Sequence, residues 1–187
     1  DAFVISLYIR SGHAEDIHQR YDAVLNQHKQ KAQTIVDCAL SLEEEQEQNR
    51  RRQLDKDAAD DDKRPVVWMV VTDAPYLKEW IVHTYDGGDS NADEQHQHRT
   101  VLTTEARGAH TKFYQQSPST TDFAEAFLDW YLIGEGTDAV VADYTGPSFG
   151  DTAAFRTNRP YYKVGEKKTG GVITTSSCEL VEPTLKW

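Results

Sequence analysis

The chain of 187 residues has little cysteine and no long apolar run. It contains two cysteines, Cys38 and Cys178, and no CxxC pair, which excludes a cysteine-based zinc site. The two cysteines are compatible with one disulfide or with two buried thiols. Since no run is long enough for a membrane helix, we expect no transmembrane segment. The sequence opens on a strand-like run at residues 3–9 without a signal peptide, so we expect it to start inside a longer protein.

Basic residues are also scarce. Lys and Arg number 20 against 31 Asp and Glu, which gives a formal net charge of -11. A nucleic-acid binder needs clustered cations to neutralise phosphates, so this class is excluded. One small phosphate ligand needs only a single arginine and some backbone amides, and it stays compatible with the composition. Neither GxxxxGK[ST] nor an early GxGxxG is present, which removes the usual support for an ATPase or an NAD enzyme.

The residues that are present alternate between strand-like and helix-like patterns. Strands are predicted at residues 3–9, 66–72, 100–103, 138–143 and 160–164, with helical patterns between them. The first and fourth of these strands are apolar on both faces, which is typical of central strands in a covered parallel sheet. The pattern predicts one α/β domain over residues 1–187: a Rossmann-like parallel sheet flanked by helices.

The first predicted helix changes character along its length. Apolar residues recur every three or four positions from Ile17 to Leu42, and the stripe then ends. Residues 43–64 contain three acidic and basic clusters and almost no apolar side chain. We therefore expect an acidic, solvated insertion there, and a partner-binding acidic arm is the alternative.

Polar residues that follow the predicted strands are the candidate site. In parallel sheets, ligands bind at the carboxyl ends of the strands. Arg10 and Gly12 follow the first strand, where a guanidinium fork suits a diphosphate and glycine allows close backbone approach. Asp73 follows the second strand. Ser148 and Phe149 follow the fourth, at a predicted helix start that suits an anion.

Several candidate residues have both a functional and a plain structural interpretation. Asp129, on the helix before the fourth strand, is suited to accept hydrogen bonds from a purine ring, or it is an exposed helix residue. Arg10 and Ser148 are equally compatible with a surface ion pair and a helix cap. His96, His98 and His110 lie in a polar region without a compelling carboxylate cluster, so no metal is expected.

Three motifs, in order, resemble those of the GT-B fucosyltransferase superfamily, which includes α1,2-, α1,6- and protein O-fucosyltransferases. The first is the strand that ends in Leu7-Tyr8-Ile9-Arg10-Ser11-Gly12-His13, and the second is Val70-Val71-Thr72-Asp73. The third and most specific contains the helix 127–133, the strand 137–141 and the turn 146–154. The resemblance spans about residues 3–164 and implies the donor-binding half of a two-domain enzyme, whose N-terminal acceptor domain is absent from this chain.

The resemblance also implies a role for each site residue. Arg10 falls on the arginine that contacts the donor β-phosphate and stabilises the departing GDP, so it is the predicted catalytic residue. Asp129 falls on the aspartate that reads guanine, and Ser148 and Phe149 fall on the turn that holds phosphate and packs near the nucleotide. Tyr8 stands where the family has a histidine near the base. The predicted donor-binding residues are Tyr8, Arg10, Gly12, Asp73, Asp129, Ser148 and Phe149.

The expected activity is an inverting, metal-independent transfer of fucose from GDP-fucose to a glycan or protein hydroxyl. By resemblance, the protein is expected in the Golgi or the endoplasmic reticulum lumen, without a cofactor. Ser11 replaces a second family arginine and His13 replaces an acid. A non-catalytic structural or recognition module with the same fold is therefore the alternative. An unrelated α/β nucleotide-binding regulator is a third hypothesis.

Overall fold

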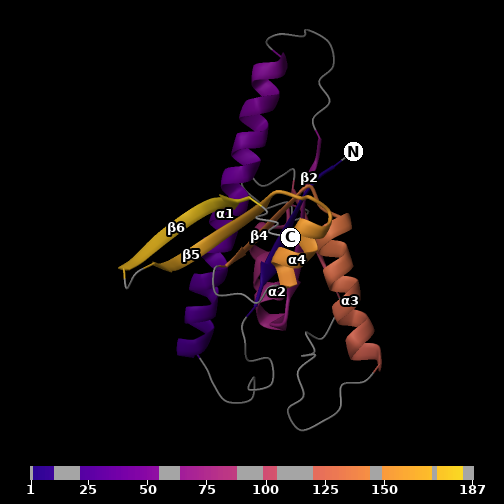
Figure 1. Ribbon diagram of the computed structural model, residues 1–187, viewed down its shortest axis with the longest axis vertical. Coiled ribbons are helices and arrows are strands. Elements are labelled where there is room, and N and C mark those ends of the chain that lie inside the picture. The colour runs from indigo at the N-terminus through magenta and orange to yellow at the C-terminus, as the bar shows by residue number, and fades with distance from the viewer. Residues whose placement is uncertain are drawn as a thin grey trace.

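The computed structural model contains a six-stranded sheet covered by four helices (Figure 1). It describes residues 2–10, 22–54, 64–87, 99–104, 120–143, 149–169 and 172–182. The strands are β1 Phe3–Ile9, β2 Val66–Thr72, β3 Arg99–Thr103, β4 Ala139–Asp143, β5 Tyr161–Thr169 and β6 Val172–Val181. The helices are α1 Asp22–Leu54, α2 Pro75–Tyr85, α3 Thr120–Glu135 and α4 Phe149–Arg156.

The strand order is β3-β2-β1-β4-β5-β6. Strands β1 to β5 pair in parallel, as expected from strands that alternate with helices. The first and fourth strands of the chain are the two central ones, which confirms the prediction from their two-sided apolarity. The chain is thus an α/β protein with a mostly parallel sheet.

Strand β6 corrects the expectation of a wholly parallel sheet. It pairs antiparallel with β5, with a register shift between Lys163 and Gly165, and forms the edge of the sheet. The last strand predicted from the sequence ends at residue 164, and no strand is predicted after it. Only two residues separate Thr169 from Val172 in the sequence, and antiparallel pairing needs no crossover helix.

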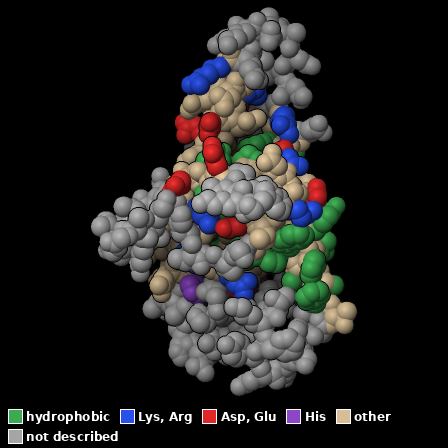
Figure 2. Space-filling model, in the orientation of Figure 1, with side chains coloured by type: hydrophobic (Ala, Val, Ile, Leu, Met, Phe, Trp, Pro, Cys, Tyr) green, Lys and Arg blue, Asp and Glu red, His purple; other side chains and the backbone are tan. Residues whose placement is uncertain are grey.

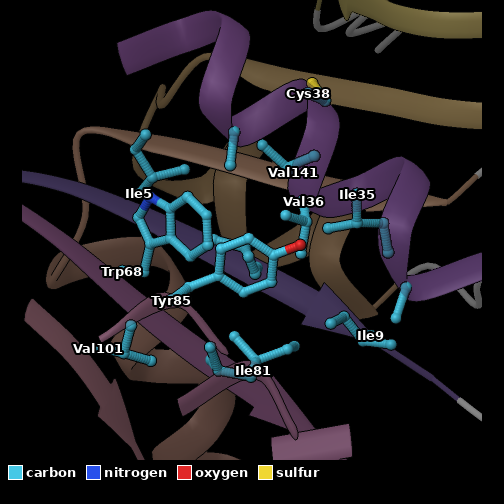
Figure 3. Packing of buried hydrophobic residues seen from close by; sticks show 14 of the residues in the cluster. Ile5, Ile9, Ile35, Val36, Cys38, Trp68, Ile81, Tyr85, Val101 and Val141 are labelled. Carbon is cyan, nitrogen blue, oxygen red and sulfur yellow. The ribbon is translucent and has the colours of Figure 1, made fainter. Parts of the chain in front are cut away.

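Two apolar layers hold the helices to the sheet. Helices α1 and α2 cover one face, where Ile35 and Val36 of α1 pack over Ile5 of β1 and Val141 of β4 (Figure 3). Helices α3 and α4 cover the other face, with Ile133 among their buried side chains. Because both faces of β1 and β4 are covered, these strands are mostly apolar on both sides, with Ser6 in β1 and Asp143 at the end of β4 as the buried polar exceptions.

Helix α1 extends beyond the sheet at its C-terminal end (Figure 1). The segment predicted to be solvated therefore begins within a helix, and Glu43 departs from that expectation. Its carboxylate accepts bonds of 2.6 and 2.5 Å from Arg99, which is buried. The Arg99 guanidinium also lies 4.1 Å from the centre of the Trp68 ring. Residues 55–63 lie outside the described part of the chain.

A disulfide joins α1 to the edge strand. Cys38 and Cys178 are bonded, which selects the disulfide from the two alternatives left open by the sequence. Cys38 is buried in the layer between α1 and the sheet, and Cys178 is partly buried against it. The bond therefore fastens β6, the last strand of the sheet, to the helix that covers the same face.

Candidate functional site

The strand order places a topological switch point at the carboxyl ends of β1 and β4. From β1 the chain proceeds to β2 and β3 on one side, and then crosses to β4 on the other. At such a switch point the two following loops separate, and ligands of α/β proteins bind there. Three charged residues stand at these strand ends: Arg10 directly after β1, Asp73 directly after β2, and Asp143 as the last residue of β4.

Arg10 and Asp73 are brought together as the sequence predicted. Arg10 Nε lies 3.8 Å from Asp73 Oδ2, a distance for an ion pair and too long for a hydrogen bond. The Asp73 side chain is 7% exposed, whereas that of Arg10 is 27% exposed. The carboxylate is thus buried behind the guanidinium, which keeps access to solvent.

The Tyr8 side chain lies beside Arg10 and contacts Phe149. Its ring stacks on that of Phe149 with centroids 5.5 Å apart, so two of the predicted donor-binding residues touch. A Cβ on Gly150 would lie 3.0 Å from the Tyr8 ring, so this close approach favours glycine at the first turn of α4. Burial raises the pKa of the Tyr8 phenol, and a side-chain hydrogen bond with Arg10 opposes the rise. The neutral phenol therefore helps to fix the direction of the guanidinium.

A second ion pair, which the sequence did not predict, lies between α1 and the end of β4. Lys31 Nζ lies 2.6 Å from Asp143 Oδ2 and donates to the carbonyl oxygen of Arg10 at 3.3 Å. One ammonium group thus ties the end of β1 to the end of β4. The sequence pattern that predicts Asp73 as a site residue also applies to Asp143, because both aspartates stand at the end of an apolar strand. Lys31 carries no such signal, because it lies within a helical pattern and follows no strand.

A buried network supports α4 from the neighbouring strand. Tyr161 donates to Asp151 Oδ1 at 2.5 Å, and Lys163 donates to Asp151 Oδ2 at 3.0 Å. Burial, followed by the bond to Asp151, raises the pKa of Tyr161. These bonds hold the first turn of α4, and with it Phe149 and Gly150, against β5.

Asp129 lies in a second cluster at the same edge of the sheet. Its side chain is buried, and its Oδ1 has no hydrogen-bond partner among the described residues. Burial raises the pKa of Asp129, while a side-chain hydrogen bond with Thr104 and the charge of Lys78 lower it. Lys78 also donates to the Thr104 carbonyl at 3.0 Å. Because Asp129 is buried, it is not the exposed helix residue that was the alternative interpretation of the sequence.

The structure thus joins Tyr8, Arg10, Asp73 and Phe149 at one place. Asp129 is placed with the residue that follows β3, two strands away from β1. Gly12 and Ser148 lie outside the described residues, as do His96, His98 and His110. Within the described ranges, no three His, Cys, Asp or Glu residues are grouped as a metal would require, and no helix there could span a membrane.

The exposure of the paired charges decides which of them this edge of the sheet presents to a ligand. Asp73 and Asp143 are 7% and 5% exposed, whereas their partners Arg10 and Lys31 are 27% and 35% exposed. The anionic groups face the protein and the cationic groups face solvent. Although the whole chain carries a charge of -11, this edge of the sheet therefore presents donors for an anionic ligand.

In comparisons with known proteins, no family model, no curated protein and no solved structure matches this chain.

Proposed function

We propose that this chain is the GDP-sugar-binding half of a GT-B glycosyltransferase of the fucosyltransferase type. The supporting observation is the partly exposed Arg10 guanidinium at the switch point, backed by a buried carboxylate. A guanidinium so placed can bind two oxygens of a diphosphate at once. The resemblance of the sequence motifs then favours GDP-fucose as the donor.

In the proposed reaction, the bond between the fucose anomeric carbon and the GDP oxygen breaks. A hydroxyl oxygen of a glycan or protein acceptor bonds to that carbon from the opposite face, and its proton passes to a general base. Arg10 binds the diphosphate, on which negative charge grows as the bond breaks, so it stabilises the departing GDP. No described residue of this chain is assigned the role of general base.

The remaining site residues have binding roles in this proposal. Tyr8, whose ring stacks on Phe149, orients Arg10 through a side-chain hydrogen bond. Asp73 holds the guanidinium by an ion pair. The Asp129 carboxylate accepts hydrogen bonds from guanine, which would supply the partner that its Oδ1 lacks. Gly12 and Ser148 complete the phosphate site by analogy with the family motifs. The disulfide supports a site of action in the oxidising lumen of the Golgi or the endoplasmic reticulum.

Replacement of Arg10 tests the proposal by calorimetry on the complete chain. We expect Arg10→Ala to weaken GDP binding by about ten- to a hundredfold, since a charge-assisted contact contributes about 1.5–3 kcal/mol. Guanosine binding should change little, because guanosine has no phosphate. The matched control is Arg156→Ala, which removes an equally exposed arginine that pairs with Glu135 at the far end of α4. If Arg10→Ala and Arg156→Ala bind GDP equally, the proposed site is wrong.

A non-catalytic recognition module is the second candidate function. The observation that favours it is that Arg10 already has a carboxylate and a phenol as partners, which limits its freedom to follow a departing GDP. Mixing the protein with GDP-fucose and an acceptor distinguishes the two. Transfer with release of GDP supports the enzyme, and GDP binding without transfer by the full-length protein supports the module.

A further inference from the structure

Helix α1 brings a second cation, Lys31, to the strand end that carries Arg10. The Lys31 ammonium lies 2.6 Å from Asp143 Oδ2 and donates to the carbonyl oxygen of Arg10 at 3.3 Å. A lysine and an arginine from two different elements thus meet at the carboxyl end of β1. The proposed reaction uses the arginine and gives the lysine no role.

The Lys31 ammonium has the capacity to bind a ligand as well as the protein. An ammonium group carries three N–H donors. Within the described part of the chain, its partners are the Asp143 carboxylate and the Arg10 carbonyl. The Lys31 side chain is 35% exposed, so it is accessible from solvent. One donor therefore remains for an acceptor atom of a ligand.

The two ion pairs at this edge of the sheet belong to one site, because both act on Tyr8. Burial raises the pKa of the Tyr8 phenol, and the charges of Asp73 and Asp143 add to the rise. Asp73 is the partner of Arg10, and Asp143 is the partner of Lys31. Charges act on a group in this way only over short distances, so both cations lie near the same phenol.

The two pairs have the same polarity toward solvent. In each of them the carboxylate is buried and the cation is partly exposed. Figure 2 shows acidic and basic side chains interspersed over one face of the molecule, so attraction of an anion depends on such local arrangements. Two neighbouring cations with buried counter-charges suit a ligand that has two adjacent anionic groups, as a diphosphate has.

We propose that Lys31 is a second phosphate-binding residue, which holds the diphosphate of the nucleotide sugar together with Arg10. This inference rests on the proposed function, since that function supplies the ligand. Arg10 offers a planar fork for two oxygens, and Lys31 offers a compact charge for one. The negative charge that grows on the departing GDP is then shared between two cations. Asp143 holds Lys31 in place, although its own charge repels the phosphate.

Calorimetry with Lys31→Met tests the inference on the full chain. We expect GDP to bind about tenfold more weakly, the lower end for a charge-assisted contact because the lysine is partly exposed. Guanosine binding should change little, and Lys31→Arg, which keeps the charge, should retain most of the affinity for GDP. The matched control is Lys29→Met on the same helix, whose ammonium lies 6.0 Å from the centre of the Trp80 ring. Circular dichroism checks that each variant is folded.

Replacement of Asp143 separates phosphate binding from a purely structural role of the ion pair. If Lys31 only supports the fold, Asp143→Asn and Lys31→Met should weaken GDP binding equally, because both break the pair. If Lys31 binds phosphate, Asp143→Asn removes a repelling charge, and GDP should bind as tightly as to wild type or more tightly. Equal losses overturn the inference. Should Asp143→Asn not fold, equal losses in Lys31→Arg and Lys31→Met overturn it instead.

Inorganic pyrophosphate distinguishes failure of this inference from failure of the proposed function. GDP binding that depends on Arg10 but not on Lys31 overturns the inference and leaves the function in place. Pyrophosphate binding that depends on Lys31, with GDP bound no more tightly than pyrophosphate, supports the phosphate role and contradicts a nucleotide site. A wild-type chain that binds neither GDP nor pyrophosphate overturns both.

Discussion

Asp73 and Asp129 are both buried aspartates at the carboxyl edge of the sheet, and their surroundings give them different properties. Asp73 lies against the guanidinium of Arg10. Asp129 has one carboxylate oxygen without a partner among the described residues, and burial raises its pKa. A buried hydrogen-bond acceptor without a partner lowers the stability of the folded protein. The presence of Asp129 at this position is explained if a ligand donates a hydrogen bond to it.

This cost predicts the effect of Asp129→Asn. The raised pKa means that the folded protein holds the proton more tightly than the unfolded chain does, where the pKa is about 3.9. The stability that this proton provides is complete below about pH 4 and is lost as the pH rises through the pKa of the folded protein. We expect Asp129→Asn to be more stable than wild type at pH 7 and to bind GDP more weakly.

Urea unfolding from pH 4 to pH 8 measures the first effect and calorimetry the second. The difference in unfolding free energy between variant and wild type should grow with pH. A difference that does not change with pH would show that the charge of Asp129 carries no penalty in the folded protein.

The sequence could predict part of the site at this scale. Arg10 and Asp73 follow strands whose two-sided apolarity reveals their ends, so their convergence followed from the parallel sheet. Lys31 could not be found in this way, because nothing in a helical pattern tells which lysine faces a strand end. The cationic character of this edge of the sheet also depends on burial of Asp73 and Asp143, which only the packed structure determines.

The helices and strands with a strong hydrophobic pattern could be predicted from the sequence, whereas the edge strand β6 could not. The central strands β1 and β4 are apolar on both faces except for Ser6 and Asp143, and α2 begins at Pro75, which suits a first helical turn. Strand β6 begins Val172-Ile173 and continues through threonines and serines, which matches neither a buried strand nor a helix. Its pairing comes from the adjacent β5, and the sequence pattern did not signal it.

The contact between α1 and β3 gives a prediction at the same scale. Glu43→Ala would leave the Arg99 guanidinium, which is 3% exposed, without its carboxylate. Loss of one partner of a buried pair costs about 3–5 kcal/mol, and the partial exposure of Glu43 places our expectation at the lower end. Chemical denaturation measures the loss. Glu44→Ala, which alters the exposed neighbour, should leave the unfolding free energy nearly unchanged, and an equal loss in both variants would contradict a specific role for Glu43.

At the scale of the whole molecule, the disulfide joins two residues that are 140 positions apart. The sequence could list this pairing as a possibility, but only the three-dimensional path of the chain brings α1 beside β6. A link across so long a loop removes many conformations from the unfolded chain.

We therefore expect the double variant Cys38→Ser/Cys178→Ser to lose about 5 kcal/mol of unfolding free energy, as loop-closure entropy for a separation of 140 residues indicates. Thermal and urea denaturation of the variant and of the oxidised wild-type protein measure this difference in unfolding free energy. Reduction of the wild-type protein should produce the same loss, and a double variant as stable as the oxidised protein would refute the expectation.

The central position of β1 has a consequence for how the protein is made. Strand β1 precedes both of its neighbours in the chain, and β4, on its second side, ends only at Asp143. At about 5–20 residues per second, a ribosome needs on the order of ten seconds to deliver β4 after β1 has emerged. During that time an apolar strand has an unpaired edge, to which a chaperone or another nascent chain can bind. Productive synthesis of this fold should therefore depend on chaperones more than its modest size suggests.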